Sequence, residues 1–316
     1  MSHPTIAVDA MGGDHAPAAV VRGAIAAVRQ GHLRLVLVGP AETLAAELRR
    51  EGGAPADALS ILNAADVVAM DESPLTALRR KPEASVRVAA DLVARGEADA
   101  LFSAGHTGAT LLAAHAAFGM LSGVERPALA VTLPTRTGAA VLLDAGANPD
   151  CRPHHLVQFA LMGSAYARVA LGVARPRVAL LSTGEEAGKG NDLIRQAHAE
   201  LTGAGVAFIG NIEAQALFSG DADVIVCDGF TGNIALKVSE GLVALIHAML
   251  GADAFGRSLA RLDYAEAGGA PLLGVGEVTV VGHGRSSPRA IESGILLAAR
   301  LADEHVVERL SEALGS

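Results

Sequence analysis

The chain has 316 residues, of which 51% are hydrophobic, and this is enough to bury a sizeable core. Its net charge of −9 excludes a general basic surface for nucleic acid, whereas a local basic patch for an acidic protein partner stays open. Only Cys151 and Cys227 occur, so we expect no disulfide framework and a reducing, cytoplasmic compartment.

The N-terminal segment Met1–Ala10 is typical of a strand, and it lacks the basic and apolar stretches of a signal peptide. No apolar run of 18 or more residues is free of charges, so we expect no transmembrane helix. The segment around Leu242 comes near to this length, but it contains Lys237 and Glu240.

Short apolar runs alternate with amphipathic stretches along the chain. The apolar runs predict strands at Thr5–Val8, Leu33–Val38, Ala98–Phe102, Leu129–Leu133, Ala139–Leu143, Val178–Leu181, Val224–Cys227 and Val278–Val281. Ala-rich segments between them predict helices at Ala18–Arg29, Glu83–Arg95, His155–Leu171 and Asn191–Leu201. This alternation predicts a doubly wound α/β fold, in which helices cover both faces of a mostly parallel sheet.

Two segments depart from the alternation. Only Pro134–Gly138 joins the fourth and fifth predicted strands, so we expect a local antiparallel hairpin there. The segment 241–268 predicts one long helix or two. It is either an arm that contacts a second subunit or a membrane, or an ordinary surface hairpin. We find no linker and no internal repeat, and we expect a single catalytic domain over residues 1–316.

Six glycine-containing loops carry most of the functional signal, and each directly follows a predicted strand. They are Met11–Asp14, Ser103–Gly108, Asp144–Asn148, Thr183–Asn191, Asp228–Asn233 and Gly282–Ser287. The carboxyl ends of parallel strands meet at one edge of a sheet, so several of these loops can converge on one cleft. Glycine lets backbone N–H groups approach an anion. Such residues are also common in ordinary turns, but six loops together favour a site for an anionic ligand.

The patterns of several other enzyme classes are missing. Gly184–Lys189 is too short between its glycines for a nucleotide-binding P-loop, and no dinucleotide-binding G-x-G-x-x-G follows a strand. The neighbouring His154 and His155 should point to different faces of a helix, so we expect neither a metal nor a cofactor. No G-x-S-x-G motif occurs, which disfavours a serine hydrolase, and Cys227 is expected to be a packed core thiol.

The glycine loops resemble those of the PlsX family of bacterial phosphate acyltransferases. The resemblance lies in Ile6–Pro17, Ser103–Ala109, Leu143–Asn148, Gly184–Gly190, Gly210–Glu213, Asp223–Lys237, Gly269–Gly274 and His283–Ser286. These blocks run from residue 6 to residue 286 and so cover nearly the whole chain. The runs D-A-M-G-G-D-H and C-D-G-F-T-G-N are long enough to be specific.

The resemblance implies a fold similar to isocitrate dehydrogenase and phosphotransacetylase, a homodimer, and peripheral contact with the inner face of the membrane. It implies that a long-chain fatty acyl group moves from acyl-carrier protein to inorganic phosphate, which gives an acyl phosphate for phospholipid synthesis. A membrane glycerol-3-phosphate acyltransferase would then take the product.

One residue departs from the family's pattern. The family usually has Asn in the loop Ser-Ala-Gly-Asn-Thr-Gly-Ala, and His106 stands in that place here. Both side chains can donate and accept a hydrogen bond, but His can also become cationic. We therefore expect phosphate affinity or its pH dependence to be altered and activity to be retained.

Attack of phosphate on a thioester needs positioning and charge stabilisation more than a covalent intermediate. Lys189, which lies between two glycines, is our first candidate for offsetting the phosphate charge, against the alternative of a solvated surface lysine. Asn233 is a candidate donor to the tetrahedral oxyanion, and a helix N-cap is its alternative role. Asp228 or Asp9 is expected to orient phosphate or accept its proton.

The expected phosphate- and substrate-binding residues lie in the glycine loops. They are Asp9, Gly12, Gly13, Asp14, Gly105, His106, Thr107, Gly108, Asn148 and His283. His15 and His283 could act as acid or base, although loop histidines are more often structural. The densest basic cluster is Arg79–Lys81, which is a candidate surface for an acidic carrier protein or simply a solvated face.

Three other functions remain open. A short-chain phosphate acyltransferase that uses coenzyme A differs only in the acyl donor. A nicotinamide-dependent hydroxyacid dehydrogenase would need metal-binding aspartates and an arginine cluster, and we find no such cluster. A non-catalytic membrane scaffold is compatible with His106, but Lys189, Asp228 and Asn233 argue against it.

Overall fold

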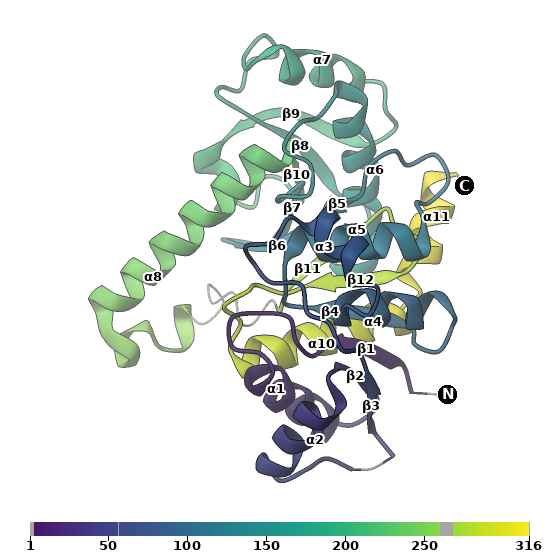
Figure 1. Cartoon of the computed structure of the whole chain (residues 1–316). Helices are drawn as coiled ribbons and strands as arrows, with labels where there is room; N and C mark the ends of the chain where they lie inside the picture. The colour runs from purple at the N-terminus through teal and green to yellow at the C-terminus, as the bar shows by residue number, and fades with distance from the viewer. Residues whose placement is uncertain (1–2, 56, 260–267, 316) are drawn as a thin grey trace. The chain divides into compact units, whose positions relative to one another are not determined.

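The computed structural model describes residues 3–55, 57–259 and 268–315, which divide into two compact units (Figure 1). We call them unit 1 (Met1–Gly119 and Tyr264–Val307) and unit 2 (Met120–Asp263 and Glu308–Ser316). The expectation that the whole chain acts as a single catalytic domain stays a prediction.

Unit 1 contains a mostly parallel sheet. Its described strands are β1 (Thr5–Asp9), β2 (Arg34–Gly39), β3 (Leu59–Asn63), β4 (Ala100–Ser103), β11 (Ala270–Leu273) and β12 (Val278–Val281). They lie in the order β3-β2-β1-β4-β12-β11, and all neighbours are parallel except β11 and β12.

Helices cover both faces of this sheet. Those of unit 1 are α1 (Ala18–Arg29), α2 (Ala41–Arg50), α3 (Pro74–Arg80), α4 (Ser85–Ala94), α5 (Thr107–Phe118) and α10 (Pro288–Asp303). Leu101 of β4 belongs to the apolar cluster that α4 and α5 form. The next residue, Phe102, lies against Gly294 of α10. Because successive side chains of a strand point to opposite faces, these helices pack on opposite sides.

Unit 2 contains a second sheet. The strands of this unit are β5 (Ala128–Leu129), which is not part of this sheet, β6 (Val131–Thr135), β7 (Gly138–Leu143), β8 (Arg177–Ser182), β9 (Ala207–Glu213) and β10 (Val224–Val226). Five of them lie in the order β6-β7-β10-β8-β9. Only the pairing of β6 with β7 is antiparallel, which confirms the predicted hairpin.

The helices of unit 2 also occupy both faces of their sheet. They are α6 (Pro153–Ala170), α7 (Asp192–Leu201), the 3₁₀-helix η1 (Ala214–Phe218) and α8 (Gly229–Leu259), and α11 (Val306–Leu314) lies near the end of the chain. On one face, Gly163 of α6 lies against Leu143. On the other face, the neighbouring Leu142 belongs to an apolar cluster that Leu236 of α8 also contacts.

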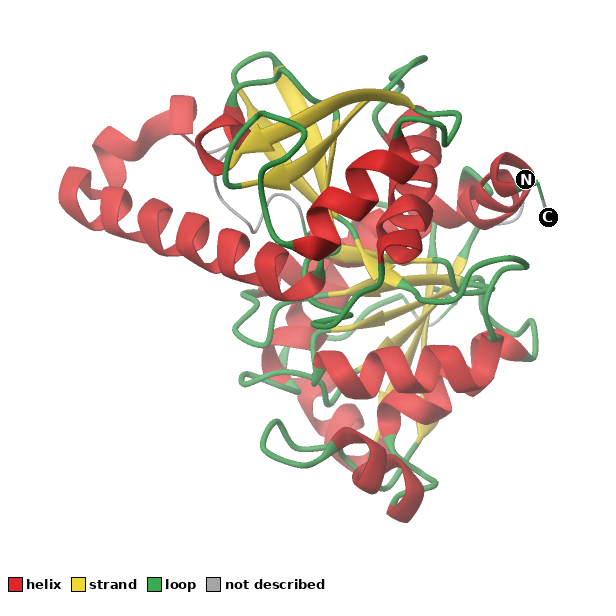
Figure 2. Ribbon diagram, turned by 90° about the horizontal axis from the view of Figure 1, so that it is seen from above, coloured by secondary structure: helices red, strands yellow, loops and turns green. Residues whose placement is uncertain are grey.

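Helix α8, which is labelled in Figure 1 and seen from above in Figure 2, is the long helix that the sequence indicated. It begins at Gly229 rather than near residue 241. The remainder of the predicted arm, residues 260–267, lies outside the described residues. Gly229–Met249 is, by length and composition alone, the one helix in the described chain that could cross a membrane. It contains the ion pair of Lys237 and Glu240 (2.9 Å), and the expectation of no transmembrane helix stays a prediction.

The predicted fold class is confirmed, because helices flank mostly parallel strands in both units. The strands form two sheets rather than one, and β3, β9 and β11 were not predicted. β3 is only half-buried, and β9 contains the polar pair Gly210–Asn211. β11 is short and contains Pro271, so none of the three has a clear apolar run.

Candidate active site

Three of the six glycine loops lie together in unit 1. Loops 11–14, 103–108 and 282–287 follow β1, β4 and β12, which are adjacent and parallel. The carboxyl ends of these strands bring the three loops to one edge of the sheet, as expected.

The backbones of these loops are in direct contact. A Cβ atom on Gly12 would lie 2.6 Å from the amide nitrogen of Gly105, so this approach requires glycine. The N–H of Asp14 donates to the carbonyl of Gly284 at 2.8 Å, which joins the first loop to the third. Gly13 has a φ of 109°, in the region that favours glycine. The loops therefore form one rim of closely packed backbone.

Asp9 anchors this rim from inside the unit. Its carboxylate accepts hydrogen bonds from the hydroxyls of Ser85 (2.6 Å) and Ser103 (2.7 Å) and from the N–H of Met11 (3.3 Å). The side chain is buried, and this burial raises the pKa of Asp9 above its ordinary value. Asp9 thus holds the first two loops together, and a direct contact with phosphate stays a proposal.

The second loop ends at the N-terminus of α5. His106 is the N-cap residue, and Thr107 and Gly108 begin the helix, where first-turn N–H groups lack helical partners. The buried Nδ1 of His106 has no hydrogen-bond partner among the described residues. A cavity of about 10 Å³, lined in part by His106, Asp9 and Thr110, lies beside it and has room for about one water molecule.

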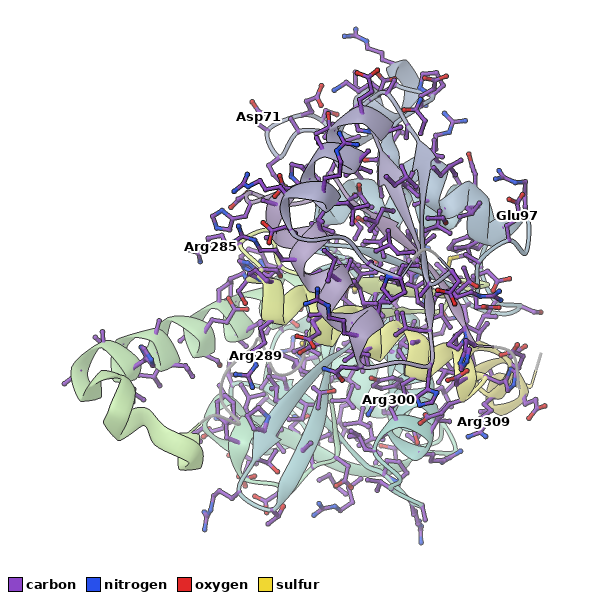
Figure 3. All side chains as sticks on the ribbon, turned by 90° about the horizontal axis from the view of Figure 1, so that it is seen from below. Asp71, Glu97, Arg285, Arg289, Arg300 and Arg309 are labelled. Carbon is purple, nitrogen blue, oxygen red and sulfur yellow. The ribbon has the colours of Figure 1, made fainter. Side chains whose placement is uncertain are left out.

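The third loop adds polar and basic side chains. The Nδ1 of His283 accepts a hydrogen bond from the N–H of Arg285 (3.1 Å), so the neutral ring has its proton on Nε2. Arg285 and Arg289 are exposed (Figure 3). Arg285 was not among the predicted site residues, although a basic residue in a loop that follows a strand was a usable signal.

The other three glycine loops belong to unit 2. The segments 144–148, 228–233 and 183–191 follow β7, β10 and β8, which are adjacent and parallel in that order. The expectation of a loop at 228–233 is wrong beyond Asp228, because α8 begins at Gly229. The sheet of unit 2 therefore presents two glycine loops and the N-terminus of α8 at one edge. A single cleft for all six loops stays a prediction.

Asp144 organises the first of these loops. Its two carboxylate oxygens accept hydrogen bonds from the backbone N–H groups of Leu129, Gly146, Ala147 and Asn148 and from the Asn148 side chain. The Asn148 amide also donates to the carbonyl of Pro127 at 2.6 Å. Both donors of Asn148 thus hold the loop, and its expected contact with substrate stays a proposal.

The first turn of α8 lies against this loop. Asp228 caps the helix, because its carboxylate accepts from the N–H (2.8 Å) and the hydroxyl (2.9 Å) of Thr231. Asn233 lies further along the first turns, so the N-cap role considered for it is wrong. It is exposed beside Gly146, and its amide has no hydrogen-bond partner in the described part of the chain. Asn233 therefore offers an unpaired amide for a ligand.

Lys189 is exposed on the loop between β8 and α7. Its backbone N–H donates to the carbonyl of Glu186 at 2.9 Å, which closes a turn. The aliphatic part of its side chain lies over Gly184, where a Cβ would be 2.9 Å from Lys189 Cγ. Within the described chain, no carboxylate lies within ion-pair distance of its ammonium group.

The two cysteines are unsuited to nucleophilic catalysis. Cys227 is fully buried in the apolar cluster of unit 2, which confirms it as a packed core thiol. Burial raises the pKa of Cys227 well above its ordinary value, and burial with the nearby Asp144 carboxylate raises the pKa of Cys151 to about 12. Neither thiol is activated, because only the thiolate is a strong nucleophile.

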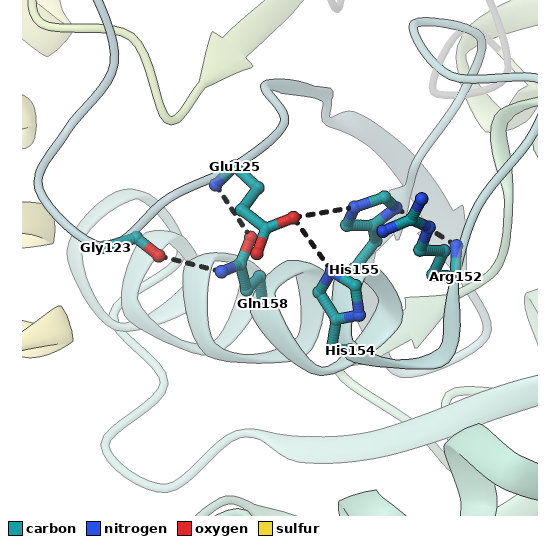
Figure 4. A network of polar contacts seen from close by, with 6 residues as sticks. All are labelled: Gly123, Glu125, Arg152, His154, His155 and Gln158. Carbon is teal, nitrogen blue, oxygen red and sulfur yellow. Dashed lines mark hydrogen bonds and ion pairs between the residues drawn. The ribbon is translucent and has the colours of Figure 1, made fainter.

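A polar network outside the glycine loops joins Glu125 to two histidines (Figure 4). The Oε2 atom of Glu125 lies 2.9 Å from His154 Nε2 and 3.3 Å from His155 Nε2. The expectation that the two rings point to different faces is therefore wrong. Both residues belong to the first turn of α6, where side chains can turn toward a group beyond the helix end.

The hydrogen bonds of this network indicate how its protons are arranged. His155 Nδ1 accepts from the N–H of Arg152 (3.1 Å), so a neutral His155 has its proton on Nε2, which faces Glu125. Burial lowers the pKa of His155 and favours this neutral form. A metal would need the Nε2 lone pair, so the geometry favours a protein hydrogen-bond network. The expected absence of a metal stays a prediction.

Several residues that shape these loops were missed by sequence reasoning. Ser103 and Asp144 begin two of the predicted glycine loops but were given no role of their own, and Ser85 was not considered. Asn211 of β9, whose side chain contacts the Lys189 loop, lay in a block that resembles the family but was also given no role. Asp144 could have been found, since it begins a glycine loop directly after an apolar run. Ser85 could not, because it lies 76 residues from Asp9 in the chain.

Comparisons with known proteins identify the family of the chain. Residues 4–309 match the family model described as fatty acid synthesis protein. The chain is 46% identical to a phosphate acyltransferase of Heliobacterium modesticaldum, with 97% of this chain and 96% of that protein covered. It is 44% identical to a phosphate acyltransferase of Nitratidesulfovibrio vulgaris, with 99% and 96% covered.

Solved structures show the same fold at low sequence identity. A phosphotransacetylase from Streptococcus pyogenes matches with a TM-score of 0.70 and 21% identity, with 96% of this chain and 94% of that chain covered. A 4-hydroxythreonine-4-phosphate dehydrogenase from Klebsiella pneumoniae matches with a TM-score of 0.58 and 16% identity, with 95% and 99% covered. The predicted likeness to the phosphotransacetylase fold is confirmed. The family model and the curated relatives extend over nearly the whole sequence, and the chain belongs to the phosphate acyltransferase family of enzymes.

Proposed function

We propose that this chain moves a long-chain fatty acyl group from acyl-carrier protein to inorganic phosphate and so supplies an acyl phosphate for phospholipid synthesis. Membership of the phosphate acyltransferase family supports phosphate as the acceptor. The observation that carries the anion site is the ammonium group of Lys189, which is exposed on a glycine loop without a carboxylate partner in the described chain. A cation of this kind can offset the charge of bound phosphate.

In the proposed reaction, a phosphate oxygen attacks the thioester carbonyl carbon. The C–S bond then breaks, and the thiolate of the carrier leaves and takes up a proton. Lys189 offsets the phosphate charge, and the unpaired amide of Asn233 donates to the tetrahedral oxyanion. Asp228 caps α8 through Thr231, and we propose that it aims Asn233 and the first-turn N–H groups at the substrate.

In unit 1, the proposed anion-binding groups are mainly backbone N–H groups. They belong to Gly13, Thr107 and Gly108, with Asp14, His106 and His283 as the accompanying side chains. The N-terminus of α5 favours a negative group there because its first-turn N–H groups lack helical partners. The N–H groups of Gly12 and Gly105 already donate to the Asp9 carbonyl and the Ser103 hydroxyl, so these two glycines shape the rim. His106, where the family usually has Asn, would tune this affinity.

The acyl donor separates this proposal from its alternative, a short-chain phosphate acyltransferase that uses acyl-coenzyme A. Carrier proteins are acidic, so docking would need exposed cations. Lys81 is held by Glu72 (2.6 Å) and by the carbonyl of Val67 (2.7 Å), which leaves Arg79 and Arg80 as the exposed cations of the predicted basic cluster. These arginines support carrier-protein docking on unit 1.

We further propose a homodimer that contacts the inner face of the membrane and passes its product to a membrane glycerol-3-phosphate acyltransferase. An apolar stripe on α8 supports the dimer. Its members are Phe230, Ile234, Val238, Leu242, Leu245 and Met249, and they are 48% to 76% exposed. They recur every three or four residues and so share one helix face. Two copies of one apolar stripe are complementary to each other.

One assay tests the proposed reaction. The purified chain is given palmitoyl-carrier protein and inorganic phosphate, and free thiol and acyl phosphate are followed, with palmitoyl-coenzyme A in parallel. We expect phosphate-dependent thiol release from the carrier protein, and a fall in kcat/KM of about a hundredfold in Lys189→Ala. Lys237→Ala is the matched control, because it removes a lysine that is paired with Glu240. Turnover of only the coenzyme A ester would favour the alternative, and turnover of neither would overturn both.

A further inference from the structure

The loop that carries Lys189 is fixed from the side of β9. Its central turn is closed by the hydrogen bond from the N–H of Lys189 to the carbonyl of Glu186 (2.9 Å). The side-chain amide of Asn211 donates to that same carbonyl oxygen at 3.0 Å. A carbonyl oxygen has two lone pairs, so both donors can bind it at once. Asn211 and the backbone of Lys189 therefore share one acceptor.

Asn211 is itself held in one orientation. It is 5% exposed, and its Oδ1 atom lies 2.9 Å from Nδ1 of His198 on α7. Because the Asn211 amide nitrogen donates to Glu186, its oxygen faces His198, and His198 Nδ1 must be the donor. The His198 ring also packs edge-on against Phe208, with ring centroids 5.1 Å apart. A chain of side chains thus extends from α7 through β9 to the lysine loop.

An irregularity in β9 makes this arrangement possible. The pairing with β8 shifts between the pairs Val178–Phe208 and Leu180–Asn211, so β9 has one extra residue there. Gly210 lies in this bulge and has a φ of 103°, a backbone conformation that glycine adopts readily. In a regular strand, Phe208 and Asn211 would point to opposite faces, because side chains alternate. The bulge brings both side chains to His198, and bulges of this kind are common beside active sites.

We propose that Asn211 is a positioning residue for the phosphate site, which acts by holding the Glu186–Lys189 turn so that the Lys189 ammonium is presented to phosphate. This inference rests on the proposed role of Lys189. Asn211 acts through Lys189 and does not itself contact the substrate. Its amide replaces solvent as the second donor to the Glu186 carbonyl and so limits the conformations of the glycine-flanked lysine, which lowers the entropic penalty of binding an anion.

The test measures phosphate binding and loop mobility in the full chain. Isothermal titration with inorganic phosphate gives the affinity without any need for turnover, and amide hydrogen exchange reports the opening of residues 186–190. We expect Asn211→Ala to weaken phosphate binding about threefold to tenfold, the effect of losing one net hydrogen bond, and to speed exchange of the Lys189 N–H. Asn211→Asp should behave like the alanine variant, because a carboxylate cannot donate to a carbonyl.

Two further variants separate positioning from general damage to the fold. Gln215→Ala removes an exposed side chain that, among the described residues, bonds only to the nearby Glu213, and it should leave binding and exchange unchanged. In a Lys189→Ala background, Asn211→Ala should weaken binding no further, because its effect passes through the lysine.

Three results would overturn the inference. They are unchanged exchange at residues 186–190 in Asn211→Ala, full phosphate affinity in Asn211→Asp, and an equal loss of affinity from Asn211→Ala with and without Lys189. A wild-type chain that binds phosphate but releases no thiol from any thioester would count against the proposed function alone. The positioning role of Asn211 would then still be tested by the phosphate-binding and hydrogen-exchange measurements.

Discussion

Asn148 donates two hydrogen bonds to Asp144, one from its backbone N–H at 2.6 Å and one from its side-chain amide at 2.8 Å. Together with the N–H groups of Leu129, Gly146 and Ala147, these bonds surround a carboxylate that is fully buried. Burial raises the pKa of Asp144, and the hydrogen bonds oppose that shift. Among the described residues no cation forms an ion pair with this carboxylate, and backbone N–H groups together with the Asn148 amide stabilise it.

Removal of this carboxylate should destabilise unit 2 strongly. We expect Asp144→Ala to lower the free energy of unfolding by about 3 kcal/mol or more, because several buried N–H groups lose their acceptor together. Urea unfolding followed by circular dichroism measures the difference. Asp150→Ala, at an exposed position in the same segment, should stay within about 0.5 kcal/mol of the wild type. A loss below about 1 kcal/mol for Asp144→Ala would contradict this role.

Two glycines of α8 should respond in opposite ways to alanine. A Cβ on Gly232 would overlap the carbonyl oxygen of Asp144, whereas one on Gly241 meets nothing within 4 Å. We expect Gly232→Ala to destabilise the fold by about 1–3 kcal/mol, since backbone must move. Gly241→Ala should stabilise it by up to about 1 kcal/mol, because alanine favours the helix. Thermal unfolding measures the change in Tm of both variants. Equal changes in Tm would mean that α8 does not approach the 144–148 loop so closely.

The candidate site was predictable to the extent that its signals are local. Glycine-containing segments directly after apolar runs marked the carboxyl ends of six strands. Lys189 could be singled out because it lies between two glycines. The division into two sheets was not predictable, because an apolar run has the same appearance in either sheet. Asn211 lay in the block Gly210–Glu213 that resembles the family, but no role could be assigned to it, because the bulge that orients it interrupts the alternation of β9.

The buried Asp9 should make the free energy of unfolding depend on pH, because its contribution is lost as the pH rises above the acid range. Burial raises its pKa above 3.8, so the folded state holds this proton more tightly than the unfolded state. Its contribution is fully present below the unfolded pKa and is lost as pH rises through the folded pKa. Asp9→Asn removes the titration, and the hydroxyls of Ser85 and Ser103 can rotate to bond an amide. We therefore expect the variant to gain stability relative to the wild type as pH rises above about 4.

Urea unfolding at several pH values measures this difference. Asp14→Asn provides the control, because Asp14 is exposed on the same loop. Wild type and Asp9→Asn curves that run parallel over the whole range would show that the Asp9 carboxyl titrates alike in the folded and unfolded states.

The histidine network of α6 makes a prediction that nuclear magnetic resonance can check. Burial lowers the pKa of His155 below 6.5, and the Glu125 carboxylate partly opposes this. Glu125→Gln should therefore lower the pKa of His155 further, because the amide has no charge. Nitrogen spectra should show the proton of neutral His155 on Nε2, and added zinc should leave its resonances in place. A zinc-dependent shift of both histidines would instead identify a metal centre.

The apolar stripe of α8 gives the proposed dimer a direct test. Val238 and Leu242 are 66% and 54% exposed and lie one turn apart, so a carboxylate at either position would have to be buried between two copies. We expect Val238→Glu and Leu242→Glu to weaken the dimer about a hundredfold, as measured by light scattering over a dilution series. His247→Glu places the same charge on the opposite face of α8 and should leave the mass unchanged. A wild-type chain that is monomeric but binds anionic vesicles through this stripe would replace the second copy with a lipid surface.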